Sequence, residues 1–260
     1  MSHLFIFGLG YTASRIADAL RSRGWQVDAT GSAGNVDFGN GEAVREAISR
    51  ASHILSSVPP DRDTGVDPVI EIYGEIFESR WTGYLSSTGV YGDQKGAWVD
   101  ESAPTGIGRR SARSDADARW LELGARVFRL PGIYGPGRSA IDRVREGKAR
   151  RIDMPDQVFS RIHVDDIVTG VIAAIDSDAP AGAYNLADDM PASGNAVTEE
   201  ACRLIGIEPP PLETLEEANL SEMARGFYSE NRRVANGKAK RALGWQPRYP
   251  TYREGLAGLA

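Results

Sequence analysis

The sequence contains very little cysteine and histidine: Cys202 is its one cysteine, and its three histidines lie far apart along the chain. One thiol excludes an intrachain disulfide and fits a reducing compartment. Scattered histidines offer no metal-ligand spacing, so no metal is expected. The apolar run at residues 4–7 is too short to span a bilayer and lacks the basic flank of a signal peptide. We therefore expect a cytoplasmic protein with no membrane partner.

Basic residues are also in short supply, because 30 Lys and Arg against 36 Asp and Glu leave a net charge of −6. An acidic chain is a poor general partner for nucleic acid. Residues 221–260 differ, since they carry eight Lys/Arg against three Asp/Glu. This basic segment can attract a phosphorylated small molecule, or it can be a solvated surface without a ligand. The expected partner is a small-molecule substrate, and the chain is expected to be a monomer or a homodimer.

The apolar run at residues 4–7 leads directly into a Gly-x-Gly-x-x-Ala pattern. Such a run is typical of a strand buried on both faces, and the apolar spacing after it predicts a helix. Gly8 permits a tight turn, Gly10 lets a pyrophosphate approach the backbone, and Ala13 keeps the helix close to the strand. The helix N-terminus supplies N–H donors and positive partial charge. The pattern therefore predicts a dinucleotide site made by Gly8, Gly10, Tyr11, Thr12 and Ala13.

The end of the second predicted strand bears on which dinucleotide binds. Residues 25–30 read as this strand, and its end at Thr30-Gly31-Ser32 has no acidic residue. An NAD site normally ends this strand with Asp or Glu, whose carboxylate accepts hydrogen bonds from the ribose hydroxyls. Ser32 can instead donate to a 2′-phosphate. The expected cofactor is NADP or NAD, with NADP favoured.

Apolar segments at residues 53–58, 81–86 and 125–130 predict further strands, which helical patterns separate. This alternation indicates an α/β protein with a Rossmann-type doubly wound parallel sheet, whose ligands bind outside the carboxyl ends of the strands. We expect a dinucleotide-binding domain of residues 1–135 plus about 160–187. A smaller C-terminal, substrate-side lobe would then comprise about 136–159 plus 188–260.

Four further segments occur in order: SSTGVYG at 86–92, RLPGIYGPG at 129–137, SRIHVDD at 160–166 and LGWQP at 243–247. With the glycine pattern, they resemble the extended short-chain dehydrogenase/reductase family, which includes nucleotide-sugar epimerases and dehydratases. The resemblance spans nearly the whole chain. It implies a catalytic serine at Ser87, and it implies that the segment with Pro131 and Tyr134 passes the nicotinamide and enters the substrate lobe.

The same resemblance supplies two further candidates. Residues 36–38 resemble the end of the family's third strand, where an Asp side chain contacts the adenine amino group. Asp37 would play that part, or it is equally a turn residue. In the third segment, Arg161 is a candidate for binding the substrate, as Tyr134 is in the second.

The family's proton relay is missing from this chain. Extended members carry a Tyr-x-x-x-Lys pair on the helix that follows the serine. Here no tyrosine occurs between Tyr91 and Tyr134, and no lysine occurs between Lys95 and Lys148. Alignment of this helix places Arg109 at the tyrosine position and Arg113 at the lysine position. Since arginine has a pKa above about 12, it cannot shuttle protons near neutral pH.

The two arginines can still bind. Arg113 can donate to a ribose hydroxyl, and Arg109 can clamp a carboxylate or phosphate of the substrate or simply lie on a solvated helix face. Tyr91 is the nearest tyrosine that could replace the missing acid. Two functions therefore stay open. One is an NAD(P)-dependent oxidoreductase or epimerase/dehydratase-like enzyme, with a non-standard acid/base, acting on a small or nucleotide-linked anionic substrate. The other is a non-catalytic dinucleotide-binding sensor or regulatory protein.

Overall fold

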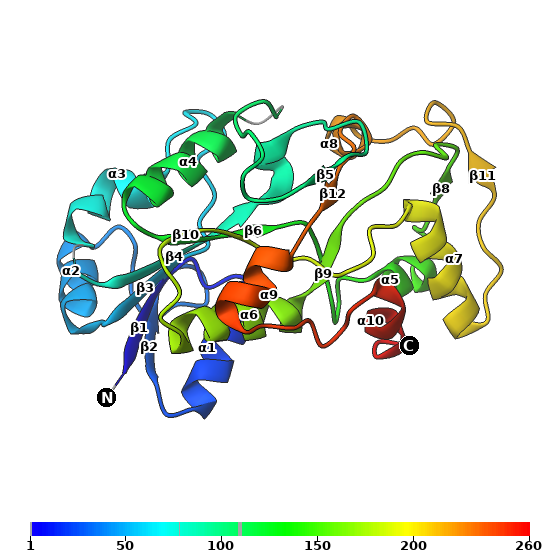
Figure 1. The fold of residues 1–260 in the computed structure, drawn as a ribbon. Helices are drawn as coiled ribbons and strands as arrows, with labels where there is room; N and C mark the ends of the chain where they lie inside the picture. Colours follow the sequence, from blue (N-terminus) through cyan, green and yellow to red (C-terminus); the bar gives the residue numbers. More distant parts are fainter. Residues whose placement is uncertain (1, 78, 109–110) are drawn as a thin grey trace.

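The computed structural model describes residues 2–77, 79–108 and 111–260. Its centre is a six-stranded parallel sheet in the order β10-β6-β4-β3-β1-β2 (Figure 1). The strands are β1 (His3–Phe7), β2 (Gln26–Ala29), β3 (His53–Ser56), β4 (Trp81–Ser87), β6 (Arg126–Leu130) and β10 (Gly182–Asn185). The strand order reverses between β1 and β3, where a doubly wound sheet binds its ligands. The predicted Rossmann-type fold is confirmed.

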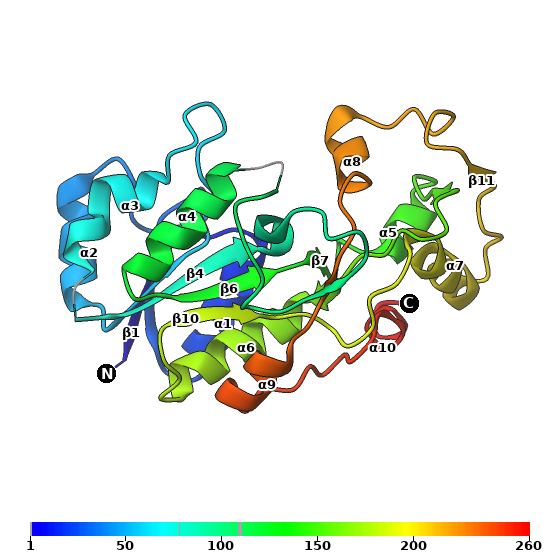
Figure 2. The same ribbon diagram turned by 45° about the horizontal axis from the view of Figure 1, so that its top comes forward.

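Helices cover both faces of this sheet (Figures 1 and 2). Leu4 and Ile6 pack in one hydrophobic cluster and Phe5 and Phe7 in another, and all four side chains are buried. This double cover explains why the first strand is apolar without alternation. The first face carries α1 (Tyr11–Ser22), α6 (Val164–Asp176) and α9 (Gly237–Leu243), and the second carries α2 (Gly41–Arg50), α3 (Pro68–Tyr73) and α4 (Ser111–Glu122).

The strand expected to end at residues 36–38 does not form. A turn closes at Gly34, whose N–H donates to the carbonyl of Gly31, and Asn40 already caps α2. The Val36 N–H donates to the Ala29 carbonyl at 3.0 Å, but no strand forms between these two points. Asp37 lies in the loop between them, and its carboxylate accepts from the Gly39 N–H at 3.0 Å. The turn reading of Asp37 therefore describes its local structure, and β2 is the edge strand on this side.

A smaller group of elements packs beside the sheet. Helices α5 (Ala140–Arg145), α7 (Gly194–Ile205) and α10 (Tyr252–Ala257) share a third hydrophobic cluster. Helix α9 falls in the range predicted for the smaller lobe, yet it packs against the sheet. The remaining elements are η1 (Gly74–Ile76), η2 (Thr88–Tyr91), β5 (Trp98–Val99), β7 (Gly132–Tyr134), β8 (Arg151–Ile152), β9 (Arg161–His163), β11 (Leu212–Glu213), α8 (Glu222–Phe227) and β12 (Arg233–Val234).

In the described part of the chain, no helix combines the length and the apolar character needed to cross a membrane.

Candidate functional site

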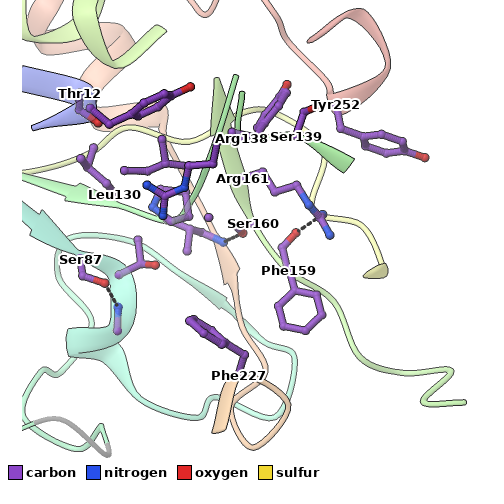
Figure 3. Close-up of a pocket in the computed structure, with 18 of the residues that line it drawn as sticks. Thr12, Ser87, Leu130, Arg138, Ser139, Phe159, Ser160, Arg161, Phe227 and Tyr252 are labelled. Atoms are coloured by element: carbon purple, nitrogen blue, oxygen red, sulfur yellow. Dashed lines mark hydrogen bonds between the residues drawn. The ribbon is translucent and has the colours of Figure 1, made fainter. Parts of the chain in front are cut away.

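A cavity of about 940 Å³ opens at the carboxyl ends of the strands, and Figure 3 shows part of its lining. The start of α1, the ends of β3, β4 and β6, helix α4 and the smaller group of elements all contribute to it. The predicted site residues that line it are Gly10, Tyr11, Thr12, Ala13, Ser87, Arg113, Pro131, Tyr134 and Arg161. Gly8, Ser32, Asp37 and Tyr91 are not among its lining residues, and Arg109 lies outside the described residues. Within the described ranges, no group of three or more His, Cys, Asp or Glu could hold a metal ion.

The two glycines of the turn have different reasons to be glycine. Gly8 has a φ of +82°, and a Cβ there would lie 2.9 Å from Val58 Cγ2. The Gly8 N–H donates to the Thr30 hydroxyl at 3.1 Å, which ties the turn to the end of β2. Gly10 has an ordinary φ of −93°, and a Cβ there would meet nothing within 4 Å. The fold therefore requires Gly8, whereas Gly10 leaves open space beside the helix.

That open space lies at the N-terminus of α1. No side chain caps this helix, and its first turn has no acidic residue. The first N–H groups of a helix have no intrahelical partner, and they carry a positive partial charge. Gly10, Tyr11, Thr12 and Ala13 line the cavity at this point. The arrangement can bind a pyrophosphate.

As the sequence indicated, no acidic residue stands at positions 30–32, directly after β2. Asp28 is engaged elsewhere, because its carboxylate lies 3.0 Å from His3 Nε2 and accepts from Asn35 Nδ2 at 2.7 Å. Gly31 has a φ of +106°, so an acidic side chain would be strained there. Ser32 is exposed in the turn that follows. A hydroxyl or a carboxylate at position 32 is thus open to solvent.

Ser87 and Arg113 line the same cavity from β4 and α4. The Ser87 hydroxyl accepts from the Gly89 N–H at 3.1 Å, which orients its oxygen and leaves its proton free to donate. Arg113 Nη1 lies 3.4 Å from the Tyr84 hydroxyl, a long contact for its donor. Both groups are hydrogen-bond donors.

One helical turn beyond Arg113, the same helix carries a buried ion pair that the sequence analysis missed. Arg129 of β6 donates to both carboxylate oxygens of Asp117, at 3.1 and 2.7 Å, and both side chains are at most 4% exposed. Ser86 donates to the same carboxylate at 2.6 Å. Burial alone would lower the pKa of Arg129, but the bonds and charge of Asp117 hold it above its usual range. This ion pair fixes α4 against β6, and the bond from Ser86 ties the same carboxylate to β4, the strand that ends in Ser87.

Tyr91 belongs to that buried network and does not reach the cavity. Its hydroxyl donates to Asn185 Oδ1 at 2.8 Å and accepts from Arg129 Nη1 at 3.0 Å. Burial raises the pKa of Tyr91, and the charge of Arg129 opposes that rise. Tyr91 and Lys95 do have the four-residue spacing of the family's pair, a match that the sequence analysis missed. Lys95 is exposed in a turn with a φ of +50°, however, so the two do not share a helix face.

Replacing Tyr91 with phenylalanine should therefore act on stability. The change leaves Asn185 and Arg129 each without one hydrogen-bond partner, at a cost of about 1–3 kcal/mol in the free energy of unfolding. Denaturant titration of both proteins measures this loss. The pH dependence of any turnover should stay unchanged. A shifted pH profile at unchanged stability would restore Tyr91 as an acid.

On the substrate side, the predicted residues are held by the protein itself. Arg161 donates to three backbone carbonyls, those of Phe159 at 2.8 Å, Ala192 at 2.9 Å and Ser193 at 3.4 Å. Burial lowers the pKa of its guanidinium. Burial also raises the pKa of the nearby Asp188 to about 7, a rise that the charge of Arg161 opposes. Arg161 thus forms part of the wall of the cavity, and its guanidinium N–H groups donate to carbonyls of the surrounding loop.

Tyr134 faces the cavity with its ring, while its buried hydroxyl has no hydrogen-bond partner in the described part of the chain. A side chain at Gly255 of α10 would collide with that hydroxyl, which shows that it points toward the helix. The ring packs edge-on against His163 at 5.2 Å. Tyr134 therefore presents apolar surface to a ligand.

Two arginines that the sequence analysis did not single out line the cavity as well. Arg138 lies with its Cζ 5.8 Å from the centre of the Tyr11 ring, beside the start of α1. Arg143, on α5, donates to the Lys148 carbonyl at 2.9 Å. No ion pair joins either one to a carboxylate among residues 2–77, 79–108 and 111–260. The cluster of basic residues around the RLPGIYGPG segment was the signal in the sequence.

No protein-family model matches the chain. It is 39% identical to a functionally unknown conserved protein from Silicibacter pomeroyi, whose solved structure matches with a TM-score of 0.88 over 100% of this chain and 98% of that one. The chain belongs to the same family as that protein. Over 145 residues it is also 34% identical to a 3-diazoavenalumate denitrifying reductase from a Streptomyces species. That match covers 52% of this chain and 47% of the reductase, so it spans about half of the relative.

More distant solved structures share the fold. The dTDP-glucose 4,6-dehydratase of Bacillus anthracis, in complex with NAD, is 18% identical with a TM-score of 0.77, over 99% of this chain and 94% of that one. A human epimerase family protein with NADPH is 15% identical with a TM-score of 0.75, over 99% of each chain. The fold is that of the extended short-chain dehydrogenases/reductases. The resemblance predicted from the motifs is confirmed at this level.

Proposed function

We propose that the protein is an NAD(P)-dependent oxidoreductase that acts as a reductase on a small anionic substrate. The observation that carries this proposal is that the uncapped N-terminus of α1, the Ser87 hydroxyl and Arg113 all face one cavity. The relatives support it, because they include a named reductase and because fold neighbours hold NAD or NADPH. The cytoplasm remains the expected location.

The residues of the chain would divide the work as follows. The N–H groups at the start of α1 hold the pyrophosphate, and Arg138 lies close enough to add a positive charge. Arg113 donates to the ribose next to the nicotinamide. When bound, the reduced cofactor supplies a hydride. Ser87 donates a hydrogen bond to the substrate oxygen, which favours the negative charge that develops there.

The missing relay favours reduction over epimerisation. An epimerase or dehydratase has to remove a proton from its substrate, and this requires a base in the cavity. Reduction of a carbonyl requires only that the oxygen take up one proton after the hydride has arrived, and water can deliver it. The described lining contains no histidine and no lysine, and Tyr134 points its hydroxyl away. The carboxylates of the lining are engaged within the protein, because Asp142 bonds Ser139, and Glu146 and Glu230 pair with Lys148 and Arg232. Ser87 and solvent suffice for the reductive direction.

Cofactor binding and turnover test this function together. Calorimetry with NADPH and NADH should show binding of both, with NADPH tighter because residues 30–32, which follow β2, include no carboxylate. Carbonyl acids incubated with the reduced cofactor should then be converted at the cofactor's expense. If a dinucleotide binds and no carbonyl, nucleotide-sugar or other acceptor is ever reduced, the sensor reading replaces the enzyme. Absence of any dinucleotide binding would refute both the oxidoreductase and the sensor function.

A substitution at Ser32 tests the choice between the two cofactors. Ser32→Asp should shift the ratio of the two dissociation constants toward NADH by about tenfold or more, or about 1.4 kcal/mol. A carboxylate there would accept from the ribose hydroxyls and repel a 2′-phosphate. Ser32→Ala should weaken NADPH alone. A wild-type protein that binds NADH about tenfold tighter would refute the preference.

A further inference from the structure

The half of the cavity that faces the smaller group of elements combines apolar walls with charged and hydroxyl side chains. Its walls include Ile133, Val158, Phe159, Val197 and Leu256, and Figure 3 shows the Phe159 ring directed into the opening. Phe227 of α8 adds a second aromatic ring to the lining. Among the described lining residues there is no Asn, Gln, Lys or His. Amide side chains, which offer a sugar hydroxyl both a donor and an acceptor, are therefore absent from the described lining.

Several of the polar side chains in this half already bond other groups of the protein. Ser139 and Asp142 bond each other, with the Ser139 hydroxyl 2.7 Å from Asp142 Oδ2. The Ser160 hydroxyl accepts from the Val234 N–H at 2.9 Å, and Arg161 serves its three carbonyls. A ligand hydroxyl placed here would find few partners, and an unpaired buried hydroxyl is costly.

The charged residues on this side follow the same rule, with one exception. Arg232 is paired with Glu230 at 2.9 Å, and Glu146 is paired with Lys148 at 2.9 Å. Arg143 donates to the Lys148 carbonyl and forms no ion pair with a carboxylate of the described residues, so these residues do not neutralise its charge. Among the described residues, this half of the cavity therefore combines apolar walls with the charge of Arg143, which no carboxylate pairs.

We propose that the substrate is a small carboxylic acid with an apolar, ring-bearing body, whose carboxylate binds Arg143, and not a nucleotide sugar. This inference rests on the proposed function, since it names the substrate class of that same site. Apolar walls favour a body that loses its hydration without losing hydrogen bonds. The guanidinium offers a planar pair of donors that fits a carboxylate. A sugar with several hydroxyls would leave most of them unpaired.

Four probes separate these requirements: phenylacetate, its neutral amide phenylacetamide, acetate, and UDP-glucose. Each is titrated calorimetrically into the protein with and without NADPH. Phenylacetate should bind about tenfold or more tighter than each of the other three, because it alone offers both the ring and the charge. Equal or tighter binding of UDP-glucose would overturn the proposal, as would no binding of phenylacetate.

Arg143→Met removes the charge and keeps an apolar stem, so it should abolish the preference for phenylacetate over phenylacetamide. The matched control is Arg145→Met on the same helix, because Arg145 is exposed and does not line the cavity. A preference that survives in Arg143→Met overturns the assignment. Dinucleotide affinity is measured on the same samples. Its absence together with acid binding would refute the oxidoreductase and leave the acid site, and the reverse result would refute the acid site alone.

Discussion

Replacing Asp117 with alanine is expected to lower the free energy of unfolding by about 3–5 kcal/mol. The change leaves the Arg129 guanidinium buried at 4% exposure without its carboxylate, and it removes the acceptor of the Ser86 hydroxyl. An uncompensated buried charge costs more than the pair itself contributes. Thermal unfolding should show a fall of roughly 6–20 °C for a chain of this size.

Two further variants make this expectation sharp. Glu46→Ala removes an ion pair to Arg50 whose two side chains are 71% and 52% exposed, and it should change stability by about 1 kcal/mol or less. The double variant Asp117→Leu, Arg129→Met removes both buried charges and should recover much of the loss. If Asp117→Ala is no less stable than Glu46→Ala, the Asp117–Arg129 pair does not hold α4 in place.

The sequence predicted those features that depend on neighbours along the chain. The apolar run at residues 4–7 can only be satisfied by burial on both faces, and the glycine pattern after it allows few backbone paths. Both were therefore predictable, and with them the parallel sheet and the edge where ligands bind. The lack of an acidic residue after Thr30 was predictable in the same way, because it depends on the local sequence alone and not on contacts with distant residues.

Other features depend on residues that meet only in the folded chain. Arg129 and Asp117 are twelve residues apart, and Tyr91 bonds Asn185 from 94 residues away. No local pattern reveals such pairings, although a charge inside the apolar strand at 126–130 was a hint that it needed a buried partner. Arg161 looked like a substrate ligand from its motif, but the carbonyls that engage it come in part from residues 192 and 193.

The expected strand at residues 36–38 failed for a local reason that could have been weighed. Asn40 caps α2 by accepting from the Ala43 N–H at 3.1 Å, and Gly34 closes a turn on the other side. Asn and Gly at those positions favour a cap and a turn. Asp37 between them is therefore held in a loop, where its part in binding adenine stays a prediction.

Replacing Gly10 with aspartate is expected to raise the dissociation constant of the dinucleotide by about 100-fold or more, or about 2.8 kcal/mol. Its carboxylate would accept from the N–H groups at the start of α1, which are the proposed donors to the pyrophosphate, and it would repel the phosphates. The same change should leave the folded protein intact, because a Cβ at Gly10 meets nothing within 4 Å and the backbone there is ordinary.

The two effects have opposite signs, which makes the test hard to satisfy by accident. Gly10 is the N-cap of α1, where aspartate exceeds glycine by a few tenths of a kcal/mol in helix stability. The variant should thus unfold at the same temperature or slightly higher while losing its ligand. Gly8→Ala is the matched control, because a φ of +82° and the close Val58 side chain should cost about 1–2 kcal/mol of stability. Calorimetry and thermal unfolding are measured on both variants. Loss of affinity without loss of stability shows that Gly10 leaves space for a phosphate, whereas loss of stability in Gly8→Ala shows that the turn requires Gly8. Unchanged dinucleotide affinity in Gly10→Asp would refute pyrophosphate binding at the start of α1.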